Sequence, residues 1–132
     1  MKQELTQKEQ EYFVKIISKA KDRLPYPIAD PSGVKIYWNE KYDANNGILG
    51  SFDWKKPSEI NLIHYGKDAP EMLVSVVAHE LHHKWQFGKY GVLYFIMAIP
   101  LLREFLLEKT ADKVEKAMDE LMEDEEFIKE IQ

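Results

Sequence analysis

The sequence contains one short motif whose residue types and spacing suit metal chemistry, His79-Glu80-Leu81-His82-His83. Because four residues span about 400° of an α-helix, His79 and His83 project from one face and can bind the same ion. Glu80 lies beside the first histidine, where its carboxylate can accept a proton from a water that zinc has acidified toward a pKa of about 7. The motif therefore predicts a hydrolytic Zn²⁺ site with Glu80 as the general base.

The residues around the motif indicate that its helix is buried. The apolar neighbours are Leu73, Val74, Val76, Val77, Ala78 and Leu81. Burying His79 and Glu80 without partners is costly, and a bound metal would remove that cost. Two alternatives stay open, because the histidines could simply be exposed on a helix, and because His79 and His82 also lie within one turn. The remaining histidine of the motif, His82, is otherwise expected to face solvent or to support a ligand.

A catalytic zinc needs a third protein ligand and an open position for water. The four histidines lie at 64, 79, 82 and 83, and the position six residues after His83 is Lys89, so the three-histidine pattern of metzincins is excluded. The sequence has no cysteine, which excludes the ligand set of peptide deformylases. A glutamate on the next helix remains, and Glu108 in Leu107-Glu108-Lys109-Thr110-Ala111-Asp112 is available, with Glu104 as the alternative.

The pair HELHH and Glu-x-x-Ala-Asp, with a spacing of 25 residues from His83 to Glu108, resembles the gluzincin metallopeptidases, in particular their minimal members. The resemblance covers about residues 60–116. It implies that His79, His83 and Glu108 bind zinc, that Glu80 is the general base, and that Asp112 hydrogen-bonds the nitrogen of His79 that faces away from the metal. The alternative for Glu108 and Asp112 is a surface pair that faces neighbouring lysines.

The same resemblance implies a zincin-like domain that binds a peptide or protein substrate in extended form. The predicted strand 59–64 would be the sheet edge to which the peptide adds by backbone hydrogen bonds. No counterpart of the Gly-x-Met-Glu-Asn element of aminopeptidase gluzincins is present, so an endopeptidase is preferred. Possible stabilisers of the oxyanion, or groups that polarise the scissile carbonyl, are His64, Tyr65, Tyr90, Tyr94 and Arg103. For His64 the simpler alternative is a residue that ends its strand.

The elements that must position these residues predict an α+β fold. It consists of an N-terminal helix, a small three-stranded sheet, mixed or antiparallel, the motif helix, and a long C-terminal helix that carries the glutamate ligand. The first helix begins after Thr6, which stands at capping-box spacing from Glu9, and ends before Pro25. Its apolar stripe is Phe13, Ile16, Ile17, Ala20 and Leu24.

Turn-forming and capping residues set the other boundaries. The predicted strands are 34–38, 48–54 and 59–64, separated by turns at 45–47 and 55–58. Asp68 offers an N-cap for the motif helix, with Pro70 in its first turn, and Gly88 would end it near Phe87. Pro100 can open the last helix, which continues beyond Lys116.

Length and charge set limits on function. The 132 residues suit one domain, 1–132, and the net charge of -5 disfavours general binding to nucleic acids. Ten acidic and four basic residues lie between Glu108 and Gln132, which predicts either a solvated helix face or a regulatory acidic segment, 119–132, that folds toward the cleft. The charged N-terminus lacks the apolar core of a secretory signal, so we expect a cytoplasmic protein. The sequence does not predict an oligomeric state.

The longest uncharged stretch, 91–102, has twelve residues, whereas a membrane-spanning helix needs about 20. We expect it to be buried core or an apolar wall beside the substrate. An interfacial membrane contact is the alternative, disfavoured because the stretch lacks a flanking basic face. The rival to the metallopeptidase hypothesis is a non-catalytic interaction module on the same scaffold, against which the intact Glu80 argues.

Overall fold

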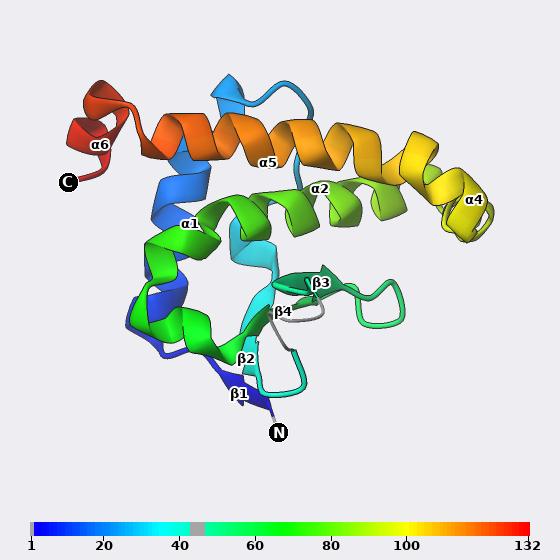
Figure 1. Ribbon diagram of the computed structural model, residues 1–132, viewed down its shortest axis with the longest axis horizontal. Helices are drawn as coiled ribbons and strands as arrows, with labels where there is room; N and C mark the ends of the chain where they lie inside the picture. The colour runs from blue at the N-terminus through cyan, green and yellow to red at the C-terminus, as the bar shows by residue number, and fades with distance from the viewer. Residues whose placement is uncertain (1, 43–46) are drawn as a thin grey trace.

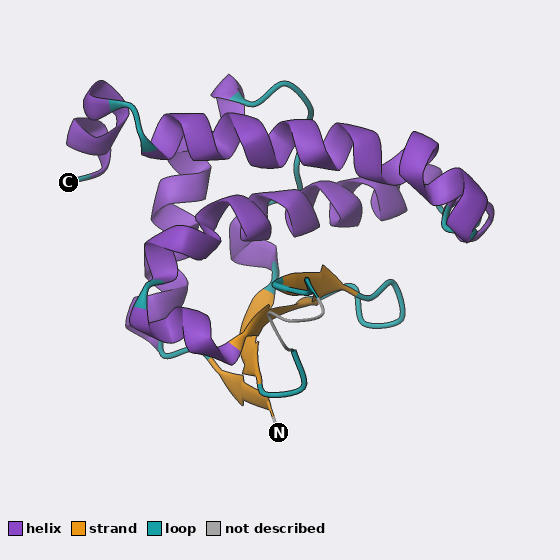
Figure 2. Cartoon of the chain, in the orientation of Figure 1, coloured by secondary structure: helices purple, strands orange, loops and turns teal. Residues whose placement is uncertain are grey.

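In the computed structural model, which describes residues 2–42 and 47–132, helix α2 lies between a small sheet and helix α5 (Figure 1). The strands are β1 (Lys2–Glu4), β2 (Lys35–Asn39), β3 (Gly50–Phe52) and β4 (Glu59–Ile63). The helices are α1 (Gln7–Ala20), α2 (Val74–Tyr90), α3 (Leu93–Met97), α4 (Pro100–Arg103), α5 (Lys109–Met122) and α6 (Glu125–Ile131). Figure 2 shows that strands are confined to the layer beneath α2, which confirms the α+β class.

The sheet is mixed, as expected, but it has four strands among the described residues rather than three, in the order β1-β2-β4-β3. The pair β2 and β4 is parallel, and the two outer pairs are antiparallel. The additional strand, β1, is polar and exposed throughout, so no alternation of apolar residues announces it. It forms because the edge of β2 offers unpaired backbone groups, and Lys2 pairs with Glu59 at 2.6 Å.

The prediction that strand 59–64 forms the sheet edge is wrong. The strand β4 is interior, flanked by β2 and β3, so its backbone groups are already used on both sides. The edge that faces α2 belongs instead to β3, which is shorter than the predicted 48–54. The turn predicted at 45–47 lies largely outside the described residues.

Helix α1 confirms the predicted capping box, since Thr6 accepts from the Glu9 backbone and the Glu9 side chain accepts from Thr6 N–H. Its apolar stripe is buried at Phe13, Ile16, Ile17 and Ala20. The helix ends one turn earlier than its stripe predicts, because a 3₁₀ turn at Lys21–Arg23 follows and leaves Leu24 partly buried beyond it.

Both predicted ends of the motif helix need correction. Two 3₁₀ turns, His64–Asp68 and Pro70–Leu73, precede α2, so Asp68 does not cap it. Helical backbone geometry is unfavourable for the residue before a proline. Ala69, which precedes Pro70, has φ -147° and ψ 65°. At the other end the helix continues through Gly88 to Tyr90, where Gly91 adopts φ 55°, a conformation that glycine tolerates best.

Pro100 opens the last helix, as predicted. The turn Glu104–Glu108 is π-helical and leads directly into α5, so one helical rod runs from α4 to Met122. The stretch 91–102 is not buried core, however, because most of its large apolar side chains are exposed and Tyr94 is the one buried. No helix in the described part of the chain is long and apolar enough to cross a membrane.

Helix α6, in the acidic segment 119–132, contacts α1 and lies at the opposite end of the molecule from α4 (Figure 1). Phe127 is fully buried in the main core, and Arg23 forms a two-pronged ion pair with Glu130 at 2.8 and 2.9 Å. A regulatory role for this segment stays a prediction.

Phe127→Ala is expected to lower the free energy of unfolding by about 3 kcal/mol, because it removes a fully buried aromatic ring. Chemical denaturation would measure the change. Phe105→Ala is the matched control, since Phe105 is 75% exposed and its truncation should alter stability by less than about 0.5 kcal/mol. Equal losses in the two variants would contradict the packing of α6 against the core.

Candidate metal centre

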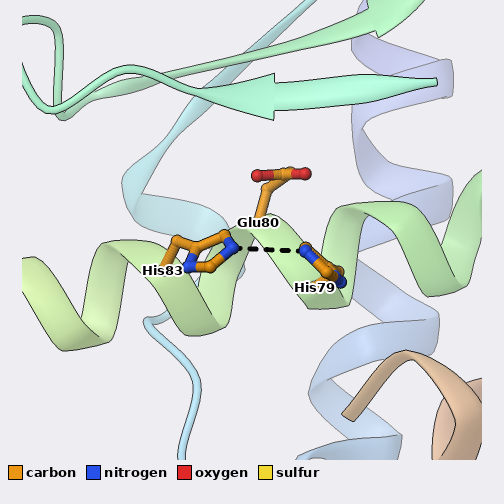
Figure 3. Close-up of side chains that lie close together, drawn as sticks. All are labelled: His79, Glu80 and His83. Carbon is orange, nitrogen blue, oxygen red and sulfur yellow. Dashed lines mark hydrogen bonds between the residues drawn. The ribbon is translucent and has the colours of Figure 1, made fainter. Parts of the chain in front are cut away.

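Three side-chain atoms from two helices converge beside the middle of α2. The Nε2 atoms of His79 and His83 lie 3.2 Å apart, and the dashed line in Figure 3 joins them. Glu108 Oε1 lies 3.3 Å from His79 Nε2 and 2.5 Å from His83 Nε2. The π-helical turn ends at Glu108, and π-turns occur frequently at functional sites. The structure thus brings together the two histidines and the glutamate that the sequence singled out.

This donor set fits a metal ion. With Zn–N and Zn–O bonds of about 2.0–2.1 Å, neighbouring ligands of a tetrahedral ion are about 3.3–3.4 Å apart. Two of the three separations, 3.2 and 3.3 Å, are close to this value. The 2.5 Å contact between His83 and Glu108 requires a proton or a cation, because two lone pairs at that distance repel. His79, Glu80 and His83 form a group on one helix that could hold a metal ion.

Glu80 points away from the line between the two histidines, toward the neighbouring strand (Figure 3). It is only 7% exposed, and burial raises the pKa of its carboxyl, against the attraction of His83 and His79. It lies in a cleft of about 260 Å³ whose walls include β3, the start of α2 and the π-helical turn. A carboxylate with a raised pKa in a restricted cleft suits a group that takes up and returns a proton.

The outward nitrogen of His79 faces two carboxylates. Its Nδ1 lies 2.9 Å from Glu115 Oε1 and 3.6 Å from Asp112 Oδ1. Asp112 is thus near the nitrogen to which the resemblance assigns it, but Glu115 is nearer. Sequence reasoning missed Glu115, although it lies seven residues after Glu108 and three after Asp112, on the same helix face. His79, Asp112 and Glu115 form a second group that could hold a metal ion.

The acidic surroundings of His79 change its proton affinity. Burial alone would lower the pKa of His79, but the adjacent carboxylates of Glu108 and Glu115 raise it to about 10. In the metal-free chain His79 is therefore protonated at neutral pH. A metal ion that binds its Nε2 must displace a proton.

Zinc affinity is expected to rise about tenfold per pH unit between pH 6 and 8, because each unit lowers the concentration of the competing proton tenfold. Isothermal titration calorimetry in buffers of different ionisation enthalpy would report the affinity and the released protons. A pH-independent affinity without proton release would contradict a zinc bond to His79.

The second candidate ligand, His83, is oriented by Gln86, which is 2% exposed. The Gln86 amide nitrogen donates to the Leu107 carbonyl at 3.0 Å, which turns the amide oxygen toward His83 Nδ1 at 2.8 Å. His83 Nδ1 must then donate its hydrogen to that oxygen. In the neutral ring the lone pair is consequently on Nε2, the atom that faces His79 and Glu108.

His82 belongs to the same buried network, so it does not face solvent. Its Nδ1 donates to the Pro27 carbonyl at 2.6 Å, and its Nε2 lies 2.7 Å from Thr110 Oγ1. Burial lowers the pKa of His82, which keeps the ring neutral and lets Nε2 accept the threonine hydroxyl. The network ties α2 to α5 and to the segment after α1. Gln86 and Thr110 were missed because a lone glutamine or threonine has no spacing signal.

Gln86→Met is expected to weaken zinc binding by about 10- to 100-fold while its side-chain volume stays similar. The change removes the acceptor that fixes His83 Nδ1–H. A competition titration with a chromophoric chelator would measure the loss. Gln3→Met, on the exposed strand β1, is the matched control and should bind zinc as the wild type does. Unchanged affinity of Gln86→Met would contradict the orienting role.

The candidate oxyanion residues and the alternative glutamate ligand differ in whether they line the cleft. Arg103 lines the cleft, and its Nε lies 3.6 Å from Glu108 Oε2. Tyr94 is buried behind the cleft against Phe87, and burial raises its pKa to about 12. Four more of these candidates lie outside the cleft walls of the described chain: His64, Tyr65, Tyr90 and the alternative ligand Glu104. Of these, His64 lines a separate hollow beside β1 and β2.

No family model, no curated protein and no solved structure matches this chain. The resemblance to gluzincins therefore rests on the sequence motifs alone.

Proposed function

We propose that this chain is a zinc-dependent metallopeptidase of the gluzincin type, with endopeptidase activity. The observation that carries the proposal is the convergence of His79 Nε2, His83 Nε2 and Glu108 Oε1 within 3.3 Å of one another. Glu80, buried in the adjoining cleft, supplies the base that such a site needs. A site that only stabilised a fold would instead be closed by a fourth protein ligand.

A zinc ion held by His79, His83 and Glu108 would acidify water and polarise the peptide carbonyl. Glu80 accepts a proton from the water whose oxygen attacks the carbonyl carbon. It then returns this proton to the amide nitrogen as the C–N bond breaks, so the products are a carboxylic acid, which keeps the other proton of the water, and an amine. The raised pKa of Glu80 favours the first transfer, because it makes the carboxylate a stronger base.

The cleft suggests how an extended peptide would bind. Strand β3 forms the edge of the sheet beside α2, so a substrate can add to it by backbone hydrogen bonds. Gly50 lets β3 approach α2 closely, since a Cβ there would lie 2.7 Å from a Val76 methyl group. Arg103, on the other wall, is the predicted oxyanion residue best placed to reach a carbonyl oxygen in the cleft.

Peptide hydrolysis by the zinc-loaded chain tests the proposal. An unfolded protein substrate, such as reduced casein, would be incubated with the chain and the products sequenced by mass spectrometry. We expect internal cleavages that stop when a chelator removes the metal and resume when zinc is restored. Release of single terminal residues would favour an exopeptidase, and intact substrate with fully zinc-loaded protein would contradict peptidase activity.

A further inference from the structure

One end of the molecule presents a set of exposed apolar side chains, which we call the apolar tip. Its residues are Val92, Leu93, Phe95, Ile96, Ile99, Leu101, Leu102, Phe105 and Leu106. Figure 1 shows α4, in the middle of this set, at the opposite end of the long axis from α6. Val92, Leu101 and Phe105 expose 78%, 84% and 75% of their surface. Contiguous exposed apolar patches of this kind commonly mark a binding surface.

The apolar tip is held in place by packing on its inner side. Tyr94 and Leu107 are buried with Phe52 in a small second core, against which Phe87 and Met97 also pack. Gly91, with φ 55°, turns the chain from α2 into α3. The exposed side chains therefore project from an ordered helical hairpin, and folding of the described chain leaves them uncovered.

The composition of the apolar tip favours a hydrocarbon partner over a protein. Every exposed member is aliphatic or phenylalanine. Protein interfaces instead concentrate their binding energy in tryptophan, tyrosine and arginine, whereas leucine and valine are under-represented among such residues. Lipid acyl chains interact with leucine, isoleucine, valine and phenylalanine without requiring any polar match.

Aromatic and basic residues surround the apolar tip. Trp54 packs on Phe95 with ring centres 4.1 Å apart, and Lys55 Nζ lies 5.5 Å from the Trp54 ring. Lys89 Nζ lies 5.8 Å from the ring of Tyr90, which packs on the second core. Tryptophan and tyrosine prefer the boundary between lipid headgroups and acyl chains, and lysine side chains extend toward headgroup phosphates.

Positive charge is concentrated on the part of the chain that carries the apolar tip, and negative charge on the rest of the C-terminal half. Segments 47–58 and 84–108, which include the apolar tip and the strand and helix residues beside it, carry five basic and three acidic residues. Residues 109–132, which run to the opposite end, carry four basic and nine acidic residues. The basic flank missing from the linear stretch 91–102 is therefore supplied by the β3–β4 loop and by α2. This polarity would orient the chain with its apolar tip toward an anionic surface.

We propose that the apolar tip docks into the interfacial region of a lipid bilayer that contains anionic lipids. The exposed side chains enter to a depth of about 5–10 Å, as in other interfacial helices, and the basic residues contact the headgroups. Arg103 belongs to the same hairpin and lines the cleft, so docking holds the cleft close to the membrane surface. The docking depends on surface residues alone and does not require the proposed peptidase activity.

Co-sedimentation with lipid vesicles tests the proposal. The full chain would be mixed with vesicles of phosphatidylcholine alone, or with 30% phosphatidylglycerol added, with and without zinc. We expect binding to the anionic vesicles that weakens as salt is raised, with or without zinc and in Glu80→Gln as well. Leu101→Ser with Phe105→Ser should reduce the partition coefficient at least about tenfold, because both side chains are exposed in the free chain and enter the bilayer.

The control substitutes exposed apolar residues outside the apolar tip. Met72→Ser with Tyr65→Ser removes side chains that are 74% and 67% exposed before α2, and should leave vesicle binding unchanged. Circular dichroism would verify that all variants fold. Absence of wild-type binding to anionic vesicles would overturn the proposal. A second result would also overturn it: the wild-type chain binds no lipid, light scattering shows that it is a dimer, and Leu101→Ser with Phe105→Ser makes it a monomer. The apolar tip would then join two copies of the chain.

Discussion

His83→Ala and Glu108→Ala are each expected to lower zinc affinity by about a thousandfold or more, because each removes one of the three proposed protein ligands. The wild-type chain should retain near one equivalent of zinc after dialysis, measured by elemental mass spectrometry. Each variant should retain little. Since His83 is 1% exposed and hydrogen-bonds Gln86, its removal can also destabilise the fold. Glu108→Ala, at a partly exposed position, separates the loss of a ligand from the loss of structure.

Two matched substitutions make the assignment specific. Glu104→Ala removes the alternative glutamate one turn earlier, and His64→Ala removes a histidine that lines a different hollow. Both should keep the wild-type zinc content. If Glu104→Ala loses zinc and Glu108→Ala keeps it, the third ligand has been assigned to the wrong glutamate. If the wild-type chain and all four variants bind no zinc, the convergence of the three side chains serves the fold alone.

The features that were predicted correctly from the sequence are those that a single local signal determines. The spacing of His79 and His83 fixes their common face in any helix, and Pro100 opens a helix wherever the following residues are helical. Thr6 and Glu9 likewise form a capping box through contacts only three residues apart. Such features depend on neighbours in the sequence, so they can be predicted without knowledge of the fold.

The parts that were missed depend on partners distant in the sequence. Strand β1 has no apolar pattern and exists because β2 offers it an edge. Gln86 orients His83 only because the Leu107 carbonyl lies opposite its amide, 21 residues away. The exposure of stretch 91–102 was missed for a similar reason, since apolar composition predicts burial, whereas the described part of the chain leaves most of these side chains exposed. Tertiary contacts therefore decide what the local signals leave open.

Glu80→Gln is expected to lower kcat for peptide hydrolysis by about a thousandfold while zinc stays bound. General acid–base catalysis contributes about 10²- to 10⁴-fold, and an amide can neither accept the proton of water nor return it to the leaving amine. The substitution keeps the shape of the side chain in its buried position on α2. Initial rates on a fluorogenic peptide and zinc content of the same sample would be measured together.

The combination of the two measurements separates catalysis from metal binding. The Glu80 carboxylate extends toward the neighbouring strand (Figure 3) and is not one of the three proposed ligands, so Glu80→Gln should keep about one zinc per chain. Glu120→Gln, an exposed substitution on α5, controls for the change of charge and should retain full activity. Loss of zinc from Glu80→Gln would place its carboxylate among the ligands rather than at the water. Activity close to wild type in a zinc-loaded Glu80→Gln would require a different base, and no other carboxylate in the cleft walls of the described chain is as deeply buried as Glu80.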